Sequence, residues 1–319
     1  MRLRRALSYV AIWLGLAGTA HAQSVGIATS NPGSLFHNIG SAVAKVANEN
    51  GLNATIQPAT SPNQYLPVVN AGEIEFGVSN LAEFTSALQG TEHFDGRPHP
   101  DLRAIGLIFP LRVAIFVRAD SDIRTIADLK GRRMPDGFTA QKVILPLLDA
   151  EYATAGLSRD DLEPVQVPSV VGGADAFMSG ETDGFFFALG AGKVREADAA
   201  VGGIRALPIA DSEKSLDAIQ EHFPFGYLRA EGPGPANPGV GEAMHVLAYP
   251  QLIFASTSTS DEAAYQLAKV LYENKEGMAA VFPPFNLFDP DAMAADIQPA
   301  QYHPGAIAFF REQGIWPGD

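Results

Sequence analysis

The sequence predicts an α/β protein of two lobes with mostly parallel sheets, joined by extended hinge strands. Short apolar runs typical of strands alternate with segments of helical periodicity from residue 25 onward, as in βαβ units. Two apolar runs, at 102–120 and 245–257, are too long for ordinary strands, and each has a proline near its middle. The same alternation fills the stretch between them, so we expect the chain to leave one lobe, build a second and return.

The predicted domain boundaries follow from these two long runs. Lobe I is expected to comprise residues 23–118 and 245–319, and lobe II residues 119–244. Residues 1–22 form a basic start, a short apolar core and a final "AHA", which is the pattern of a secretory signal cleaved after Ala22. An uncleaved anchor is the alternative, but the apolar core is shorter than the roughly 20 residues of a membrane span. We therefore expect an exported protein.

Composition excludes several classes of function. The formal net charge is −14, and the signal segment holds three arginines and no acid, so the remainder is more acidic still. Such a surface argues against nucleic acid as a partner. The chain has no cysteine, which excludes thiol catalysis and cysteine metal sites. Its seven histidines lack HxH or HxxxH spacing, so no metal or cofactor is expected.

Periodicity and turn residues place the elements in order. Strands are expected at 25–29, 53–59, 74–80, 132–135, 162–168, 182–188 and 204–209, besides the two long runs. Helices are expected after residue 34 and at 64–72, 81–90, 139–156, 172–180, 191–203, 260–278 and 304–313. Pro146 lies inside the helix expected at 139–156 and should kink it. Residues 230–243 are rich in glycine and proline and read as a loop.

The first strand leads directly into a candidate binding loop. Ser30 or Asn31 can cap the following helix, with Pro32 in its first turn. Gly33 lets a ligand approach the backbone, Ser34 adds a hydroxyl donor, and Leu35 follows at the start of the helix. A helix N-terminus at a strand end favours anions such as carboxylates. An ordinary, well-capped strand-to-helix turn is the alternative.

The second lobe repeats this design. Gly137 and Phe138 lead to Thr139 as an expected cap, and Lys142 falls in the first turn of the expected helix. Because a cation opposes the helix dipole there, Lys142 needs a negative partner, either a protein carboxylate or a ligand. Other strand ends add candidates from three further loops. These are Pro62, Asn63, Asn80, Phe187 and Gly190. Five such loops shared between two lobes predict a cleft.

Taken together, several segments resemble the TAXI family of solute receptors for TRAP transporters. The resemblance rests on "IATSNPGSLFHNIGSAVAKVANE", "LPVVNAGEIEFGVSN", "IADLKGRRM", "AFMSGETDGFFFALGAG" and "YHPGAIAFFREQGIWP" in this order. It implies a type II periplasmic-binding-protein fold that closes on a small organic solute, often a carboxylate. It also implies delivery of that solute to a TRAP-type membrane permease from the periplasm.

The contact loops depart from that family while the scaffold is kept. Leu35 and Phe36 stand where the family usually has a tyrosine pair, and "TSPNQY" and "DGFTAQ" replace its glycine-rich turns. We expect a monomeric receptor for a small organic anion whose apolar part packs against Phe138 or Phe187. Two alternatives remain open: a ligand sensor for a signalling partner, and a periplasmic enzyme. Nothing favours catalysis, because "NPGSLF" is not a GxSxG nucleophile motif.

Overall fold

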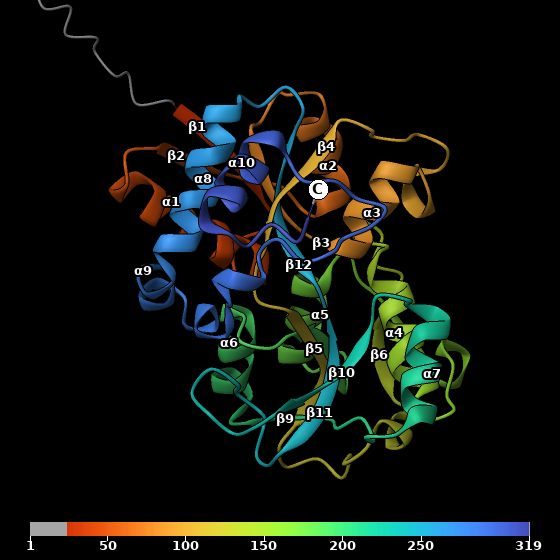
Figure 1. Cartoon of the computed structure of the whole chain (residues 1–319). Helices are drawn as coiled ribbons and strands as arrows, with labels where there is room; N and C mark the ends of the chain where they lie inside the picture. Colours follow the sequence, from red (N-terminus) through yellow and green to blue (C-terminus); the bar gives the residue numbers. More distant parts are fainter. Residues whose placement is uncertain (1–23, 319) are drawn as a thin grey trace, which may run out of the picture.

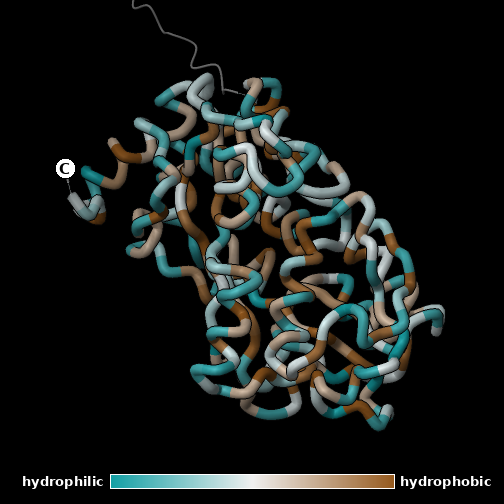
Figure 2. The backbone as a smooth tube through the Cα atoms, turned by 90° about the vertical axis from the view of Figure 1, so that its right-hand side faces the viewer, coloured by the Kyte–Doolittle hydropathy of each residue, from teal (hydrophilic) through white to brown (hydrophobic). Residues whose placement is uncertain are grey.

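The computed structural model describes residues 24–318 and shows an α/β fold with two lobes (Figure 1). The expected signal segment and its cleavage after Ala22 lie outside the described residues. Within residues 24–318, none of the helices combines the length and the hydrophobicity that a bilayer crossing requires. In Figure 2, hydrophobic segments gather in the interior of both lobes and hydrophilic segments follow the outer turns.

The upper lobe in Figure 1 contains the five-stranded sheet A, in the order β2-β1-β3-β12-β4. Strands β1, β2 and β3 are parallel, whereas β12 runs antiparallel to both of its neighbours. The helix α1 follows β1 after the loop at 30–34, and its apolar residues Leu35, Ile39, Val43 and Val46 fall on one buried face. The strand bounds are β1 (Ser24–Thr29), β2 (Asn53–Pro58), β3 (Phe76–Asn80), β4 (Leu102–Leu107) and β12 (Gln251–Ser256).

The lower lobe contains sheet B, in the order β10-β11-β5-β8, with β9 also paired to β5. A short parallel sheet C, β6-β7, lies beside it, and the Asp183 N–H next to β8 donates to the Arg133 carbonyl of β6 at 2.8 Å. The bounds are β5 (Leu111–Arg118), β6 (Arg133–Asp136), β7 (Glu163–Gln166), β8 (Gly184–Ala188), β9 (Ile204–Ala206), β10 (Tyr227–Glu231) and β11 (Met244–Tyr249).

The α/β class is confirmed, but the expectation of mostly parallel pairing is wrong. Every pairing within sheet B is antiparallel, and β12 is antiparallel inside sheet A. The cause is the path of the chain. β4 and β5 lead from sheet A to sheet B, whereas β11 and β12 lead back, so each returning strand runs antiparallel to the outgoing strand beside it. Helical crossovers impose parallel pairing only where a helix joins two neighbouring strands.

The two long apolar runs form paired strands that connect the sheets, as expected. β4 ends at Leu107 and β5 begins at Leu111, with Pro110 between them. β11 ends at Tyr249 and β12 begins at Gln251, with Pro250 between them. The predicted lobe boundaries fall at the end of β5 and the start of β11, and both of these strands belong to sheet B. The division of the chain into two independently folding lobes stays a prediction.

Helices cover both faces of each main sheet (Figure 1). In the upper lobe α1, α8 and α10 lie on one side of sheet A and α2 and α3 on the other; in the lower lobe α5 packs with α6, and α4 with α7. The α-helices are α1 (Leu35–Glu49), α2 (Pro62–Asn70), α3 (Leu81–Gln89), α4 (Ile144–Ala153), α5 (Val170–Met178), α6 (Gly192–Val201), α7 (Glu213–His222), α8 (Asp261–Glu273), α9 (Lys275–Val281) and α10 (Pro304–Gln313). Single 3-10 turns are η1 (Glu92–Phe94), η2 (Ile126–Leu129), η3 (Arg159–Asp161), η4 (Pro283–Leu287) and η5 (Pro290–Ala292).

One helix start and two further elements differ from expectation. α4 begins at Ile144 rather than at 139, so Pro146 lies in its first turn, where the missing N–H has no intrahelical acceptor to lose, and the expected mid-helix kink is wrong. α7 and β10 were not expected, because the segment around them is strongly polar. At the other end, α8 begins after Ser260, whose hydroxyl accepts from the Ala263 N–H at 3.2 Å, as expected.

Candidate functional site

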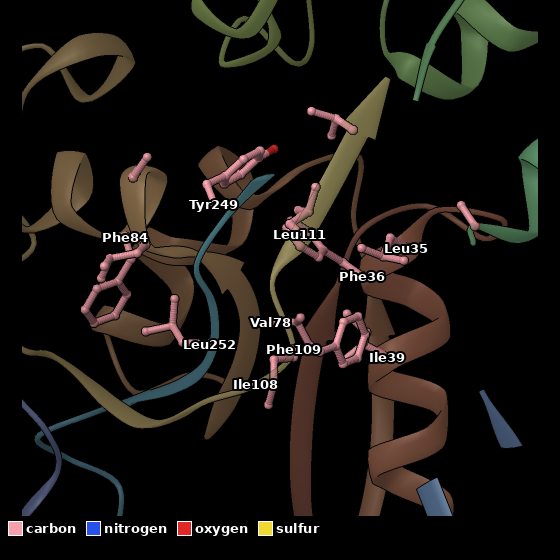
Figure 3. Packing of buried hydrophobic residues seen from close by; sticks show 14 of the residues in the cluster. Leu35, Phe36, Ile39, Val78, Phe84, Ile108, Phe109, Leu111, Tyr249 and Leu252 are labelled. Carbon is pink, nitrogen blue, oxygen red and sulfur yellow. The ribbon is translucent and has the colours of Figure 1, made fainter. Parts of the chain in front are cut away.

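A cavity of about 260 Å³ lies where the two sheets meet. It is bordered from above by the loop after β1, the first turn of α1 and the first turn of α3. It is bordered from below by the starts of α4 and α5, the end of β8 and residues 222–225. The crossing strands close one side, where Leu111 of β5 pairs with Tyr249 of β11. Figure 3 shows Leu111 between Tyr249 on one side and Leu35 and Phe36 at the start of α1 on the other.

The loop after β1 folds as a tight turn before the helix begins. The Ser34 N–H donates to the Asn31 carbonyl at 3.1 Å, and Gly33 has φ of 87°, so Pro32 and Gly33 are the central residues of a β-turn. Ser34 is then the N-cap of α1, and its hydroxyl accepts from the His37 N–H at 3.1 Å. The expectation that Ser30 or Asn31 caps this helix is wrong, because the turn must be completed before helical geometry starts.

Six of the predicted binding residues border the cavity: Ser30, Asn31, Ser34, Leu35, Asn80 and Phe187. The others lie outside its lining: Gly33, Pro62, Asn63, Phe138, Thr139, Lys142 and Gly190. Gly33 instead joins the two lobes, because its carbonyl accepts from the Lys193 N–H at the start of α6 at 3.3 Å. Ser61, beside Pro62, donates from its hydroxyl to the Ala140 carbonyl of the other lobe at 2.8 Å. Gly33 and Ser61 thus form hydrogen bonds between the two lobes beside the cavity.

The loop at 137–142 is arranged differently from the prediction. Its Thr139 and Ala140 N–H groups donate to the carbonyls of Val167 and Pro168, so they are occupied within the lower lobe. Phe138 is fully buried there, while Thr139 and Lys142 are exposed. Thr139 is therefore not a helix cap, and Lys142 is not in the first turn of α4. The reason is the later start of that helix, which the sequence pattern alone does not reveal.

The start of α5 is a helix N-terminus of the lower lobe that borders the cavity, the role that the prediction gave to the 137–142 loop. Ser169 caps α5 by accepting from the Gly172 N–H at 3.3 Å, and the Val170 N–H donates to the side chain of Gln141 at 3.0 Å. Ser169, Val170 and Gln141 all border the cavity. A serine directly before an apolar run is a readable capping signal, so this helix start was accessible to sequence reasoning.

Asn80 and Glu83 form a buried polar pair on the wall of the cavity. Asn80 caps α3, and its Oδ1 accepts from the Glu83 N–H at 2.9 Å. Its Nδ2 in turn donates to Glu83 Oε2 at 2.5 Å, while Glu83 Oε1 has no hydrogen-bond partner among the described residues. Glu83 is only 5% exposed, and this burial raises its pKa to about 8 despite the opposing hydrogen bond from Asn80. The prediction missed Glu83, although a cap residue followed three positions later by Glu is a sequence signal.

The remaining wall is largely apolar, with a group of aromatic side chains, and carries little charge. Phe186 and Phe187 of β8 both border the cavity, as do Phe36, Phe223, Phe225 and Tyr249. No lysine or arginine of the described chain lies in this lining, and its ionisable members besides Glu83 and Tyr249 are Glu92, His93 and His222. Burial lowers the pKa of His93, which favours its neutral form. The site is suited to a small solute with an apolar body and few polar groups.

Comparison with known proteins agrees with this architecture. The structure of a protein from Bordetella bronchiseptica RB50 superimposes with a TM-score of 0.53 at 15% identity, covering 91% of this chain and 98% of that one. A structure described as a periplasmic transporter gives 0.53 at 12% identity, with 93% and 95% covered. The periplasmic aliphatic sulphonate binding protein SsuA from Escherichia coli gives 0.49 at 17% identity, with 93% and 94% covered.

At these identities the first two likenesses establish the fold alone, an α/β fold that this chain shares with those two structures. A family model carries the assignment further, because it aligns with residues 27–314 and so includes both sheets and every element around the cavity. The chain belongs to the NMT1-like family.

Proposed function

We propose that this protein is a periplasmic solute-binding receptor that holds a small organic anion, such as a carboxylate, in the cavity between its lobes. The single observation that carries the proposal is the cavity itself, enclosed by the starts of helices from both lobes. A site shared between two lobes is suited to capture by closure, since a solute that contacts both halves favours the closed state. The proposal is of a binding protein, with no catalytic step.

Three helix starts support an anion as the solute. α1, α3 and α5 begin at Leu35, Leu81 and Val170, and the first turn of each borders the cavity. Helix N-termini carry partial positive charge and N–H groups without intrahelical acceptors. Several of these N–H groups already donate to neighbouring residues, as the Leu81 N–H does to the Pro250 carbonyl. The support for an anion is therefore the partial positive charge of the three helix starts, in a described lining without lysine or arginine. The aromatic wall around Phe187 and Tyr249 then takes the apolar part of the solute.

The proposed partner is a TRAP-type integral membrane permease, and the proposed assembly state is a monomer. The permease is supported by the resemblance of the ordered segments to TAXI receptors, and the periplasm by the signal-like residues 1–22. A membrane gene of the TRAP type beside the gene for this protein would support delivery to a permease. A neighbouring sensor-kinase gene would favour the signalling alternative.

Native mass spectrometry of the protein purified from its own periplasm tests the proposal, followed by isothermal titration of the solute that is retained. We expect an organic anion, and we expect Ser34→Ala to weaken its binding roughly tenfold, or about 1.4 kcal/mol. Ser260→Ala is the matched control, because it removes an equivalent serine cap from α8, which does not border the cavity. A retained cation, or equal binding by both variants and the wild type, would contradict the proposal.

A further inference from the structure

We propose that Glu83 keeps its carboxyl proton in the receptor and donates it, as an O–H···O hydrogen bond, to the anionic group of the solute. This inference rests on the proposed function and names the polar group that the cavity offers to its ligand. No bond to the proton is broken in this step: the proton stays on Glu83 and gains an acceptor. The consequence is that only the protonated receptor binds the anion well.

The hydrogen bonds of Asn80 fix which oxygen of Glu83 is free. Asn80 Oδ1 accepts from the Glu83 backbone N–H at 2.9 Å, so its Nδ2 must be the group 2.5 Å from Glu83 Oε2. Oε2 therefore acts as an acceptor, and Oε1 is the natural site of the proton. Oε1 is buried and has no partner among residues 24–318, although Glu83 borders the cavity. A buried hydroxyl without an acceptor is destabilising, and a ligand oxygen that accepts from it would relieve this.

Among residues 24–318, the amide of Asn80 and the partial positive charge at the start of α3 both favour the charged form of Glu83, but burial outweighs them and raises its pKa to about 8. Tyr65 of α2 and Tyr249 of β11 interact with it electrostatically, and burial holds the pKa of each phenol well above its ordinary range, so both are neutral. Glu92 and His93 of η1, and His222 at the end of α7, are the other ionisable groups on the cavity wall. Because the described part of the chain places no lysine or arginine in the cavity lining, an ionised Glu83 would be a buried charge without a cationic partner there.

A solute cation on an ionised Glu83 is the rival arrangement, and it makes the opposite prediction. An ammonium group would release the proton of Glu83, so its affinity would rise with pH. An anion needs the proton, so its affinity would fall with pH above about 8, where Glu83 ionises. The helix starts around the cavity favour the anion.

The test uses two probes of the same shape, 3-phenylpropanoate and 3-phenylpropylamine, titrated calorimetrically into the mature chain from pH 6.5 to 9.5. For the wild type we expect 3-phenylpropanoate to bind with constant affinity up to about pH 8 and about tenfold more weakly per pH unit above it. Glu83→Gln keeps an N–H donor without a titratable proton, so its affinity should not change with pH and should exceed that of the wild type at pH 9.5. Glu151→Gln is the control, a buried carboxyl outside the cavity lining, and should keep the wild-type profile.

Infrared spectra of the ligand-free protein at pH 7 provide the second readout. The wild type should show absorption of a protonated carboxyl that is reduced in Glu83→Gln. Anion binding that does not change with pH in the wild type, or the lack of this spectral difference, would overturn the role of Glu83. A wild type that binds the amine and rejects the propanoate would instead overturn the proposed anion function. Binding of neither probe, with the carboxyl absorption present, would count against the proposed function while leaving the protonation of Glu83 established.

Discussion

Glu151 gives a quantitative prediction of how the stability of this protein depends on pH. The residue lies on α4 in the lower lobe and is 0% exposed. Burial raises its pKa from an ordinary 4.5 to about 8, and neither of its carboxylate oxygens has a hydrogen-bond partner among the described residues. The perturbation is Glu151→Gln, which keeps the shape of the side chain and removes its charge at every pH.

The sign and size follow from proton linkage. Because the folded pKa exceeds the unfolded one, the folded state binds more protons between pH 4.5 and about 8. The stability that neutral Glu151 contributes is therefore complete below pH 4.5 and is lost as the pH rises to about 8. Each pH unit in this window removes about 1.4 kcal/mol, so the wild type should lose about 4 kcal/mol from this residue between pH 5 and pH 8.

Urea unfolding followed by circular dichroism at pH 5, 6, 7 and 8 measures this effect. The free energy of unfolding of Glu151→Gln relative to the wild type should rise by about 4 kcal/mol from pH 5 to pH 8. Glu83→Gln should show a similar trend, because its carboxyl is buried to a similar degree with a similarly raised pKa. Glu276→Gln, at an exposed position of α9, should show none. A difference that stays within 1 kcal/mol at all four pH values would refute the reasoning.

Three further predictions concern other parts of the chain. Glu231→Gln should cost about 3–5 kcal/mol of unfolding free energy, because Arg112 Nη1 lies 2.7 Å from Glu231 Oε2 in a buried ion pair. The double variant Arg112→Met/Glu231→Met should lose less, and equal losses in unfolding experiments would contradict this account. Ser34→Ala should lower the unfolding free energy by about 1 kcal/mol through the lost cap of α1, whereas Asn31→Ala, which caps nothing, should leave it unchanged. N-terminal sequencing of the periplasmic fraction should find Gln23 first, and an uncleaved chain in the membrane fraction would disprove export.

The candidate site was predictable where a short sequence motif fixes local geometry. The connection between the first strand and the first helix was recognised from Pro32, Gly33 and Ser34, because proline fixes φ and glycine permits a positive φ. Pro32 was nevertheless placed in the helix, whereas it lies in the turn before it. Asn80 was recognised at a strand end, and it caps α3 as such a residue can. Which residue caps α1 was assigned wrongly, since a turn and a capped helix start share the same residue types.

Residues brought to the cavity from distant segments were not predictable in the same way. Glu83 owes its raised pKa to burial on a cavity wall, and sequence shows neither the wall nor the burial. Tyr249 reaches the cavity because β11 pairs with β5 across 138 residues of chain. Lys142 was expected at the site and is exposed outside it, because α4 starts later than its periodicity suggests.

Sequence patterns were enough to predict the alternation of strands and helices, the two proline-centred runs that connect the sheets, and the α/β class. These features depend on periodicity and on proline, which act within a few residues. The antiparallel pairing of sheet B, the position of the cavity and the burial of Glu83 became visible in the folded protein alone. Those depend on which distant segments pack together, and many pairings are compatible with the same local pattern. Strand pairing and side-chain burial depend on the free energy of the whole packed chain, and local sequence patterns therefore do not predict them.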